Sequence, residues 1–130
     1  MRLLHRPQTV LLALALLALA GCGARLEYDK NVTVKPLGVE RIYWDEPLVE
    51  KATVKIKSPG VQVNTYLVLQ SNLDAADRAL DAGKAPKDVL ASAEKTEEKT
   101  FEIAPGKKPF ALLLASTGKR AEVSVKVSGK

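Results

Sequence analysis

Histidine and cysteine are almost absent from this chain of 130 residues, since each occurs once, as His5 and Cys22. With one histidine beside the N-terminus, neither a Ser-His-Asp nor a Cys-His nucleophile system is expected. One cysteine excludes an intramolecular disulfide, and the two shortages together exclude zinc sites of the usual Cys/His type. The composition therefore predicts a protein that is not an enzyme and that carries no cofactor or metal.

The first 21 residues are typical of a bacterial secretion signal. Arg2 and Arg6 give a positive start, and an uninterrupted apolar run follows from Val10 to Ala20. A membrane-spanning helix needs roughly 20 apolar residues to cross about 30 Å of hydrocarbon, so this run is too short to span. We predict a signal peptide over residues 1–21.

The sequence Leu19-Ala20-Gly21-Cys22 resembles the lipobox of bacterial lipoproteins. In that family a diacylglycerol alkylates the cysteine thiol and the chain is then cut before it, which implies lipidation of Cys22 and cleavage between Gly21 and Cys22. Two acyl chains suffice for stable anchoring, because each buried methylene contributes about 0.8 kcal/mol. The alternative is an ordinary secretory signal with an incidental cysteine. Gly23 in place of Asp favours an outer-membrane anchor facing the periplasm over the inner membrane.

Cleavage before Cys22 leaves 109 residues, enough for one domain. It removes His5, so the mature chain has neither imidazole nor free thiol. It also removes Arg2 and Arg6, so eighteen basic residues face the 15 acidic ones and the net charge falls from +5 to +3. The lysines are interleaved with acidic residues and no basic stripe alternates with aromatics, so nucleic acid is not an expected partner.

Most of the mature chain shows the two-residue period of β-strands. The cleanest case is Ala121 to Val127, while Phe110 to Ser116 is apolar on both faces and predicts a central strand. Ser58-Pro59-Gly60 predicts a turn joining its flanking strands in a hairpin. The other strand-like segments are residues 39–44, 52–57, 61–70, 89–92 and 100–103. These segments predict a single small antiparallel β-sandwich, all-β, with about six to seven strands.

Two segments fall outside this pattern. Residues 22–36 hold few core-sized apolar groups and predict a tether after the lipidated cysteine, with an edge strand at residues 31–35 as an alternative, so the sandwich is expected over residues 37–130. Residues 72–83 carry apolar groups at helical spacing between Asn72 and Gly83, which suit an N-cap and a C-cap. A short helix or ordered loop is expected there.

Asp74, Asp77 and Asp81 would lie along one stripe of that helix, and calcium favours carboxylate oxygens. The spacing does not match an EF-hand loop, and Arg78 competes as a partner. A solvated helix face is the default interpretation, and cation binding by the stripe stays an open alternative.

The segment around Tyr43 and Trp44 is the best candidate binding site, because it holds the only tryptophan and exposed aromatics serve as platforms for sugars or proteins. Alternatively, one of these rings caps the core at a strand end before Pro47. Asp45 and Glu46 could suggest an acid and base for glycoside hydrolysis, but adjacent strand residues point to opposite faces.

The mature domain resembles pre-peptidase C-terminal and Golgi-dynamics β-sandwich modules. The resemblance rests on Val61 to Leu67, on Ala104-Pro105-Gly106 before Phe110 to Leu114, and on the strand from Ala121 to Val127. Asn64-Thr65-Tyr66 stands where the bacterial module usually has Asp-Leu-Tyr, so a metal-linked role does not carry over. The resemblance implies a non-catalytic accessory or binding role.

Together these features predict a lipid-anchored, non-enzymatic envelope lipoprotein that acts as an accessory or protein-binding module. Its expected partners are the membrane, through Cys22, and an envelope protein. The alternative is a carbohydrate or cell-wall binding module that uses the Tyr43 and Trp44 region for a glycan.

Overall fold

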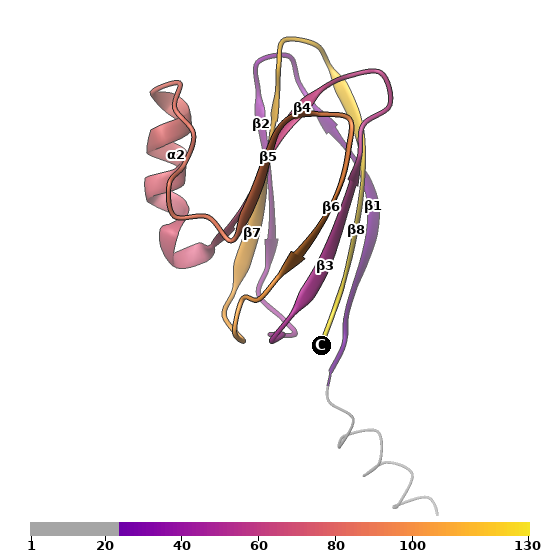
Figure 1. Cartoon of the computed structure of the whole chain (residues 1–130), viewed down its shortest axis with the longest axis vertical. Helices are drawn as coiled ribbons and strands as arrows, with labels where there is room; N and C mark the ends of the chain where they lie inside the picture. Colours follow the sequence, from indigo (N-terminus) through magenta and orange to yellow (C-terminus); the bar gives the residue numbers. More distant parts are fainter. Residues whose placement is uncertain (1–23) are drawn as a thin grey trace, which may run out of the picture.

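The computed structural model describes residues 24–130, which form two antiparallel sheets packed face to face with one helix on the outside (Figure 1). The predicted signal peptide, Gly21 and Cys22 lie outside the described residues. The elements are β1 (Leu26–Val34), β2 (Val39–Trp44), β3 (Ala52–Lys57), β4 (Val63–Leu69), η2 (Gln70–Asn72), α2 (Leu73–Asp81), β5 (Ala91–Thr96), β6 (Glu98–Ile103), β7 (Phe110–Ser116) and β8 (Ala121–Gly129).

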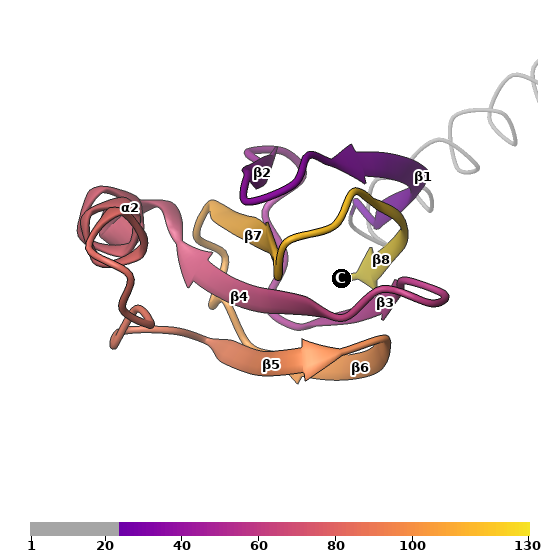
Figure 2. The same cartoon turned by 90° about the horizontal axis from the view of Figure 1, so that it is seen from above.

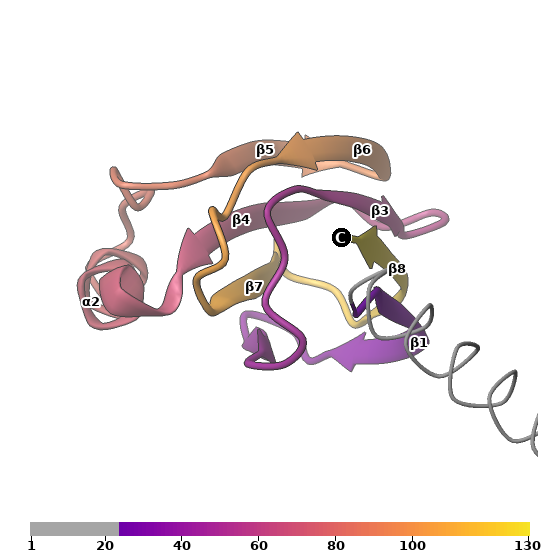
Figure 3. The same ribbon diagram turned by 90° about the horizontal axis from the view of Figure 1, so that it is seen from below.

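The first sheet has the strand order β1-β8-β3-β6 and the second has the order β2-β7-β4-β5. Seen along the strands, the two sheets enclose a shared interior, and α2 lies against the outer face of the second sheet (Figures 2 and 3). The predicted β-sandwich is confirmed, with eight strands among the described residues where about six to seven were expected. The short helix predicted near residues 72–83 is confirmed as α2.

The predicted tether is wrong over β1, an edge strand whose second half overlaps the alternative strand expected at residues 31–35. This strand pairs with β8 along its whole length, from Leu26 opposite Gly129 to Val34 opposite Ala121, so the sandwich begins at Leu26 and not at residue 37. Leu26 and Val34 are buried and Tyr28 packs against the core. Every second residue of the strand faces the core, and most of these residues are apolar. The charged residues between them point to solvent.

The predicted hairpin between β3 and β4 is also wrong. β3 pairs with β6 and β8 in the first sheet, whereas β4 pairs with β5 and β7 in the second. The turn between them crosses the sandwich: buried Ser58 donates its N–H to the Glu97 carbonyl (2.6 Å) and its hydroxyl to the Val61 carbonyl (2.7 Å). Both strands bury an apolar face in the same core, so they pack across it.

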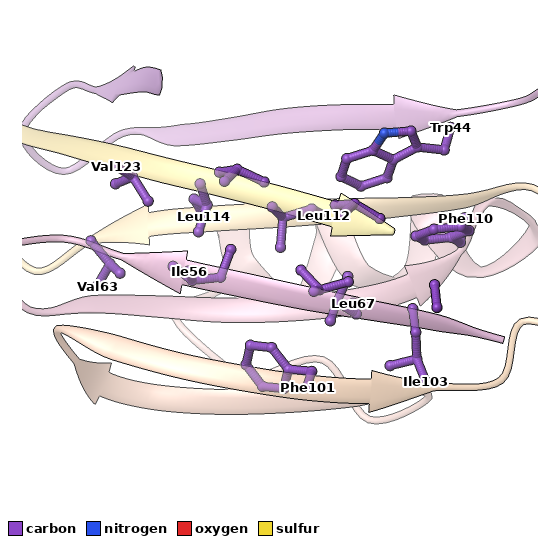
Figure 4. Close-up of a cluster of buried hydrophobic side chains, with 14 of the residues drawn as sticks. Trp44, Ile56, Val63, Leu67, Phe101, Ile103, Phe110, Leu112, Leu114 and Val123 are labelled. Atoms are coloured by element: carbon purple, nitrogen blue, oxygen red, sulfur yellow. The ribbon is translucent and has the colours of Figure 1, made fainter. Parts of the chain in front are cut away.

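β7 lies inside the second sheet and confirms the predicted central strand. Leu112 and Leu114 point into the space between the sheets with Ile56, Leu67 and others (Figure 4). Leu113, by contrast, lies on the outer face with Tyr66, Val68 and Ala76 beneath α2. The sandwich therefore has two apolar layers, a large one between the sheets and a small one under the helix.

The sandwich has a proximal and a distal end. The proximal end carries the start of β1, the loops 45–51 and 104–109, and Lys130; the distal end carries the turns 35–38, 58–62 and 117–120 (Figure 1). Among residues 24–130, no helix has the length and apolarity needed to cross a membrane.

Candidate binding groove

Tyr43 and Trp44 point to opposite sides of the second sheet, as expected for neighbours on a strand. Trp44 is 5% exposed and faces the core, whereas Tyr43 is 48% exposed on the outer face. The Trp44 ring stacks on Phe110, with ring centroids 5.1 Å apart, and meets Tyr28 edge-on at 5.2 Å. Within the described residues its indole N–H finds no acceptor. Trp44 thus caps the core, and Tyr43 alone stays available as a surface aromatic.

Asp45 and Glu46 lie exposed in the proximal loop after β2. The Asp45 carboxylate accepts a hydrogen bond from Gln70 Nε2 (2.9 Å), and the same amide group lies within 3.3 Å of the Phe110 carbonyl oxygen. This contact ties the loop after β2 to the end of β4. The arrangement gives Asp45 a structural contact.

The aspartate stripe of α2 is divided between solvent and an ion pair. Asp77 Oδ1 accepts from Arg41 Nη2 (2.8 Å) and Nε (2.9 Å), whereas Asp74 and Asp81 are exposed. The Asp77 hydrogen bond is the main cause that raises the pKa of the Arg41 guanidinium. Arg41, and not the neighbouring Arg78, is therefore the partner that α2 uses. Across residues 24–130 no cluster of three His, Cys, Asp or Glu side chains could hold a metal ion.

Replacing Arg41 with methionine should loosen α2 from the sheet and lower the free energy of unfolding by about 1 kcal/mol. The value is modest because both partners are about one-third exposed (34% and 29%), so solvent screens the pair. A double-mutant cycle with Asp77→Asn, followed by urea unfolding, measures the coupling. Arg78→Met on the exposed face is the matched control and should change stability by under about 0.5 kcal/mol. A coupling energy of zero would contradict the docking role of this pair.

An open groove of about 340 Å³ lies at the distal end, between the C-terminus of α2 and the second sheet. Tyr66, Val39 and Ala115 contribute from the sheet, Leu80 contributes from α2, and Leu37 contributes from the turn between β1 and β2. Its polar groups include Asn64, Lys84, Glu94 and Ser116. The groove, defined by these residues, combines apolar and polar groups in similar measure.

Leu37 is the most exposed large apolar side chain of the described residues, at 83%. It sits third in a turn closed by a hydrogen bond from Gly38 N–H to the Lys35 carbonyl (2.9 Å), with Pro36 second. Its φ of +59° is a conformation that suits glycine or asparagine and is an outlier for a bulky residue. A strained backbone thus holds an apolar side chain out in solvent, a combination that points to a function.

The wall formed by α2 is fixed by its C-terminus. Gly83 has a φ of +72°, its N–H donates to the Leu80 carbonyl (3.0 Å), and the Lys84 N–H donates to the Ala79 carbonyl (2.8 Å). These two bonds form a Schellman motif in which Ala82 is the C-cap, one residue before the expected Gly83, and Gly83 is the positive-φ glycine that follows it. Asn72 occupies the N-cap position, but its side chain makes no capping hydrogen bond. The motif fixes the position of Leu80 and Lys84 beside the groove.

Tyr66 and Glu94 provide the hydrogen-bonding chemistry of the groove. The Tyr66 ring is buried under α2, and its hydroxyl donates to Glu94 Oε2 (3.2 Å). Burial, followed by the charge and hydrogen bond of Glu94, raises the pKa of Tyr66 to about 12. The carboxylate accepts at both oxygens, so Glu94 can also bind an N–H of a partner.

Tyr66 should titrate later than an unfolded tyrosine, whose pKa is about 10. Between about pH 10 and pH 12 the unfolded chain loses this proton and the folded chain keeps it, so stability should fall as pH rises through this window. Burial also raises the pKa of Tyr28, so the difference in tyrosinate absorbance between the wild type and Tyr66→Phe isolates Tyr66. If the absorbance that disappears in Tyr66→Phe titrated near pH 10, like that of an unfolded tyrosine, the buried placement of Tyr66 would be contradicted.

Sequence reasoning did not find this groove. Its members come from one turn, four strands, the last turn of α2 and the residues after that helix, and no local motif joins them. One signal was present, namely Pro36-Leu37-Gly38, a turn sequence with leucine where a turn of this type favours glycine. The predicted pair Tyr43 and Trp44 does not take part in the groove.

No protein-family model matches this chain, and no curated protein matches it. Among solved structures it is similar to a mitogen from Yersinia pseudotuberculosis (TM-score 0.54, 7% identity, 82% of this chain and 88% of that one). It is also similar to a periplasmic inhibitor of g-type lysozyme from Aeromonas hydrophila (0.50, 10%, 83% and 89%). A third match is the pre-peptidase C-terminal domain of a Bacillus anthracis collagenase (0.47, 10%, 76% and 88%). At such identities the first two likenesses show a shared fold.

Proposed function

We propose that this chain is a lipid-anchored, non-enzymatic binding module of the bacterial envelope, and that its distal groove holds an apolar segment of a protein partner. The observation that carries the proposal is Leu37, a leucine held at positive φ and 83% exposed beside a groove that combines apolar and polar groups. A monomer gains nothing in stability from this arrangement, whereas a bound partner would bury the side chain.

The chemistry of the groove suggests what it holds. Leu37, Val39 and Leu80 suit an apolar side chain, and Glu94 suits a backbone N–H or an ammonium group beside it. A protein segment supplies both features. A sugar platform would need an exposed aromatic surface, and in the Tyr43 and Trp44 region only Tyr43 offers one. We therefore favour a protein partner over a glycan.

The fold itself leaves the function open, because one fold serves many functions. That a periplasmic lysozyme inhibitor of Aeromonas hydrophila has this fold is compatible with a role that consists of binding a protein. The lipid anchor is proposed from the lipobox alone, with Cys22 as the modified residue and the outer membrane, facing the periplasm, as the location. Mass spectrometry of the N-terminal peptide extracted from membranes should show a diacylglyceryl group on Cys22.

Site-specific photo-crosslinking in cells tests the groove. p-Benzoylphenylalanine placed at Ala85, an exposed residue of the groove, should give a discrete protein adduct. The matched control carries the same group at Glu122, which is exposed at the distal end on the outer face of the first sheet. An adduct from position 85 that is missing from position 122 supports the groove. Equal labelling from both positions, or none, would overturn it.

A further inference from the structure

The chain between the proposed anchor and the sandwich is short. Only Gly23, Ala24 and Arg25 separate Cys22 from Leu26, where β1 begins. An extended chain advances at most about 3.6 Å per residue, so the start of β1 lies within about 14 Å of Cys22. The sequence alone had predicted a tether to residue 36, which would have left the domain free to turn. With β1 in the sheet, the proximal end is held beside whatever holds Cys22.

The proximal end is a single connected platform. Lys130 donates its N–H to the Lys51 carbonyl (3.1 Å), and its own carbonyl accepts from the Glu50 N–H (3.2 Å). The Lys107 N–H donates to the Val49 carbonyl (2.8 Å), which ties the loop 104–109 to the loop 45–51. The C-terminus and both proximal loops therefore present one surface.

That surface carries an exposed apolar side chain among long cationic ones. Leu48 is 45% exposed in the loop 45–51. The exposed basic residues of this end are Arg25, Lys51, Lys107, Lys108 and Lys130, and its exposed acidic residues are Glu27, Asp45, Glu46, Glu50 and Glu102. Lys and Arg side chains can reach lipid phosphates while their stems lie along an apolar surface. The five basic and five acidic side chains of this end balance, so the short tether, and not electrostatic attraction, sets the contact.

We propose that the proximal end lies against the phospholipid bilayer, with Leu48 entering the boundary between headgroups and acyl chains. The inference rests on the proposed anchoring of Cys22. β1 runs for nine residues from this end, and a strand rises about 3.3 Å per residue. The groove would thus stand about 30 Å from the membrane and face outward, where another envelope protein can reach it.

The test uses the chain from Cys22 onward, which keeps every described element. Its only thiol couples Cys22 to maleimide-bearing lipid in phosphatidylethanolamine and phosphatidylglycerol vesicles whose acyl chains are brominated. Leu48→Trp adds a second tryptophan at the proximal end, and Thr117→Trp adds one at the distal end; the wild type supplies the Trp44 baseline. The emission of each added tryptophan is the emission of the variant minus that of the wild type. Relative to unbrominated vesicles, this emission should fall at least twofold for position 48 and should not change for position 117.

A second variant distinguishes the effect of the short tether from the effect of the proximal surface itself. Inserting about 15 Gly and Ser residues between Gly23 and Ala24 gives a flexible linker, and quenching at position 48 should then fall back toward the baseline. Equal quenching at positions 48 and 117, or no quenching at position 48, would overturn the proposed orientation. Because the coupling is chemical, neither result depends on whether cells lipidate Cys22, which the mass of the N-terminal peptide reports separately.

Discussion

Replacing Leu112 with alanine is expected to lower the free energy of unfolding by about 4 kcal/mol, within the range of about 2–5 kcal/mol for a buried leucine. Leu112 is fully buried and lies on β7, a strand with a neighbour on each side, at the centre of the layer between the sheets (Figure 4). The surrounding strands are fixed by two hydrogen-bonded ladders and cannot collapse into the cavity. Natural domains are stable by only about 5–15 kcal/mol, so this change should remove a large part of the total.

Leu113→Ala is the matched control, one residue away on the same strand and also fully buried. Its side chain lies on the outer face beneath α2, and that helix can move toward the sheet because it is held mainly by one ion pair and a small apolar cluster. The loss should therefore be smaller, about 2 kcal/mol. Urea unfolding of both variants measures the difference. A larger loss at Leu113 would contradict the view that the layer between the sheets is the main core.

The two-residue period was enough to predict most of the fold. Three strands were predicted with the bounds that the structure has, namely Val39–Trp44, Ala52–Lys57 and Phe110–Ser116. Each of them has apolar residues on one or both of its faces. Of β1, only the second half was foreseen, as the alternative edge strand at residues 31–35. The first half was missed because Lys30 takes one of the inward positions and polar or charged residues alternate with the rest. β5 was predicted at residues 89–92, so its start was two residues and its end four residues too early, because Val89 and Leu90 are apolar whereas the residues of β5 itself are small or polar.

Strand pairing could not be predicted in the same way. A turn sequence such as Ser58-Pro59-Gly60 reverses the chain in either a hairpin or a crossover between sheets. The choice depends on Glu97, whose carbonyl accepts from Ser58 and whose side chain accepts from the Gly60 N–H (2.8 Å). That residue is nearly forty positions away, so the contact cannot be predicted from the local sequence. The groove was missed for the same reason, since its walls come together only after the sheets form.

Replacing Leu37 with glycine should abolish most partner binding without harming the fold. Glycine adopts a φ of +59° without strain, whereas leucine there costs about 1–3 kcal/mol. The side chain is 83% exposed, so its removal forfeits little burial in the free protein. Glycine adds unfolded-state entropy that offsets about 0.4–1 kcal/mol of the relief. Stability should stay the same or rise by about 1 kcal/mol, while the yield of the adduct from position 85 should fall at least tenfold.

Lys107→Gly is the control that separates strain from contact. Lys107 has the same φ of +59° but lies at the proximal end, away from the groove. Its replacement should change the thermal midpoint much as Leu37→Gly does and should leave the adduct unchanged, and Leu37→Met should also preserve the adduct. If Leu37→Gly kept full crosslinking, the exposed leucine would not be the partner's contact. If it unfolded the chain, the turn would need the side chain for a structural reason. The expected result, a fold intact and a partner lost, would mean that the strained turn exists for binding.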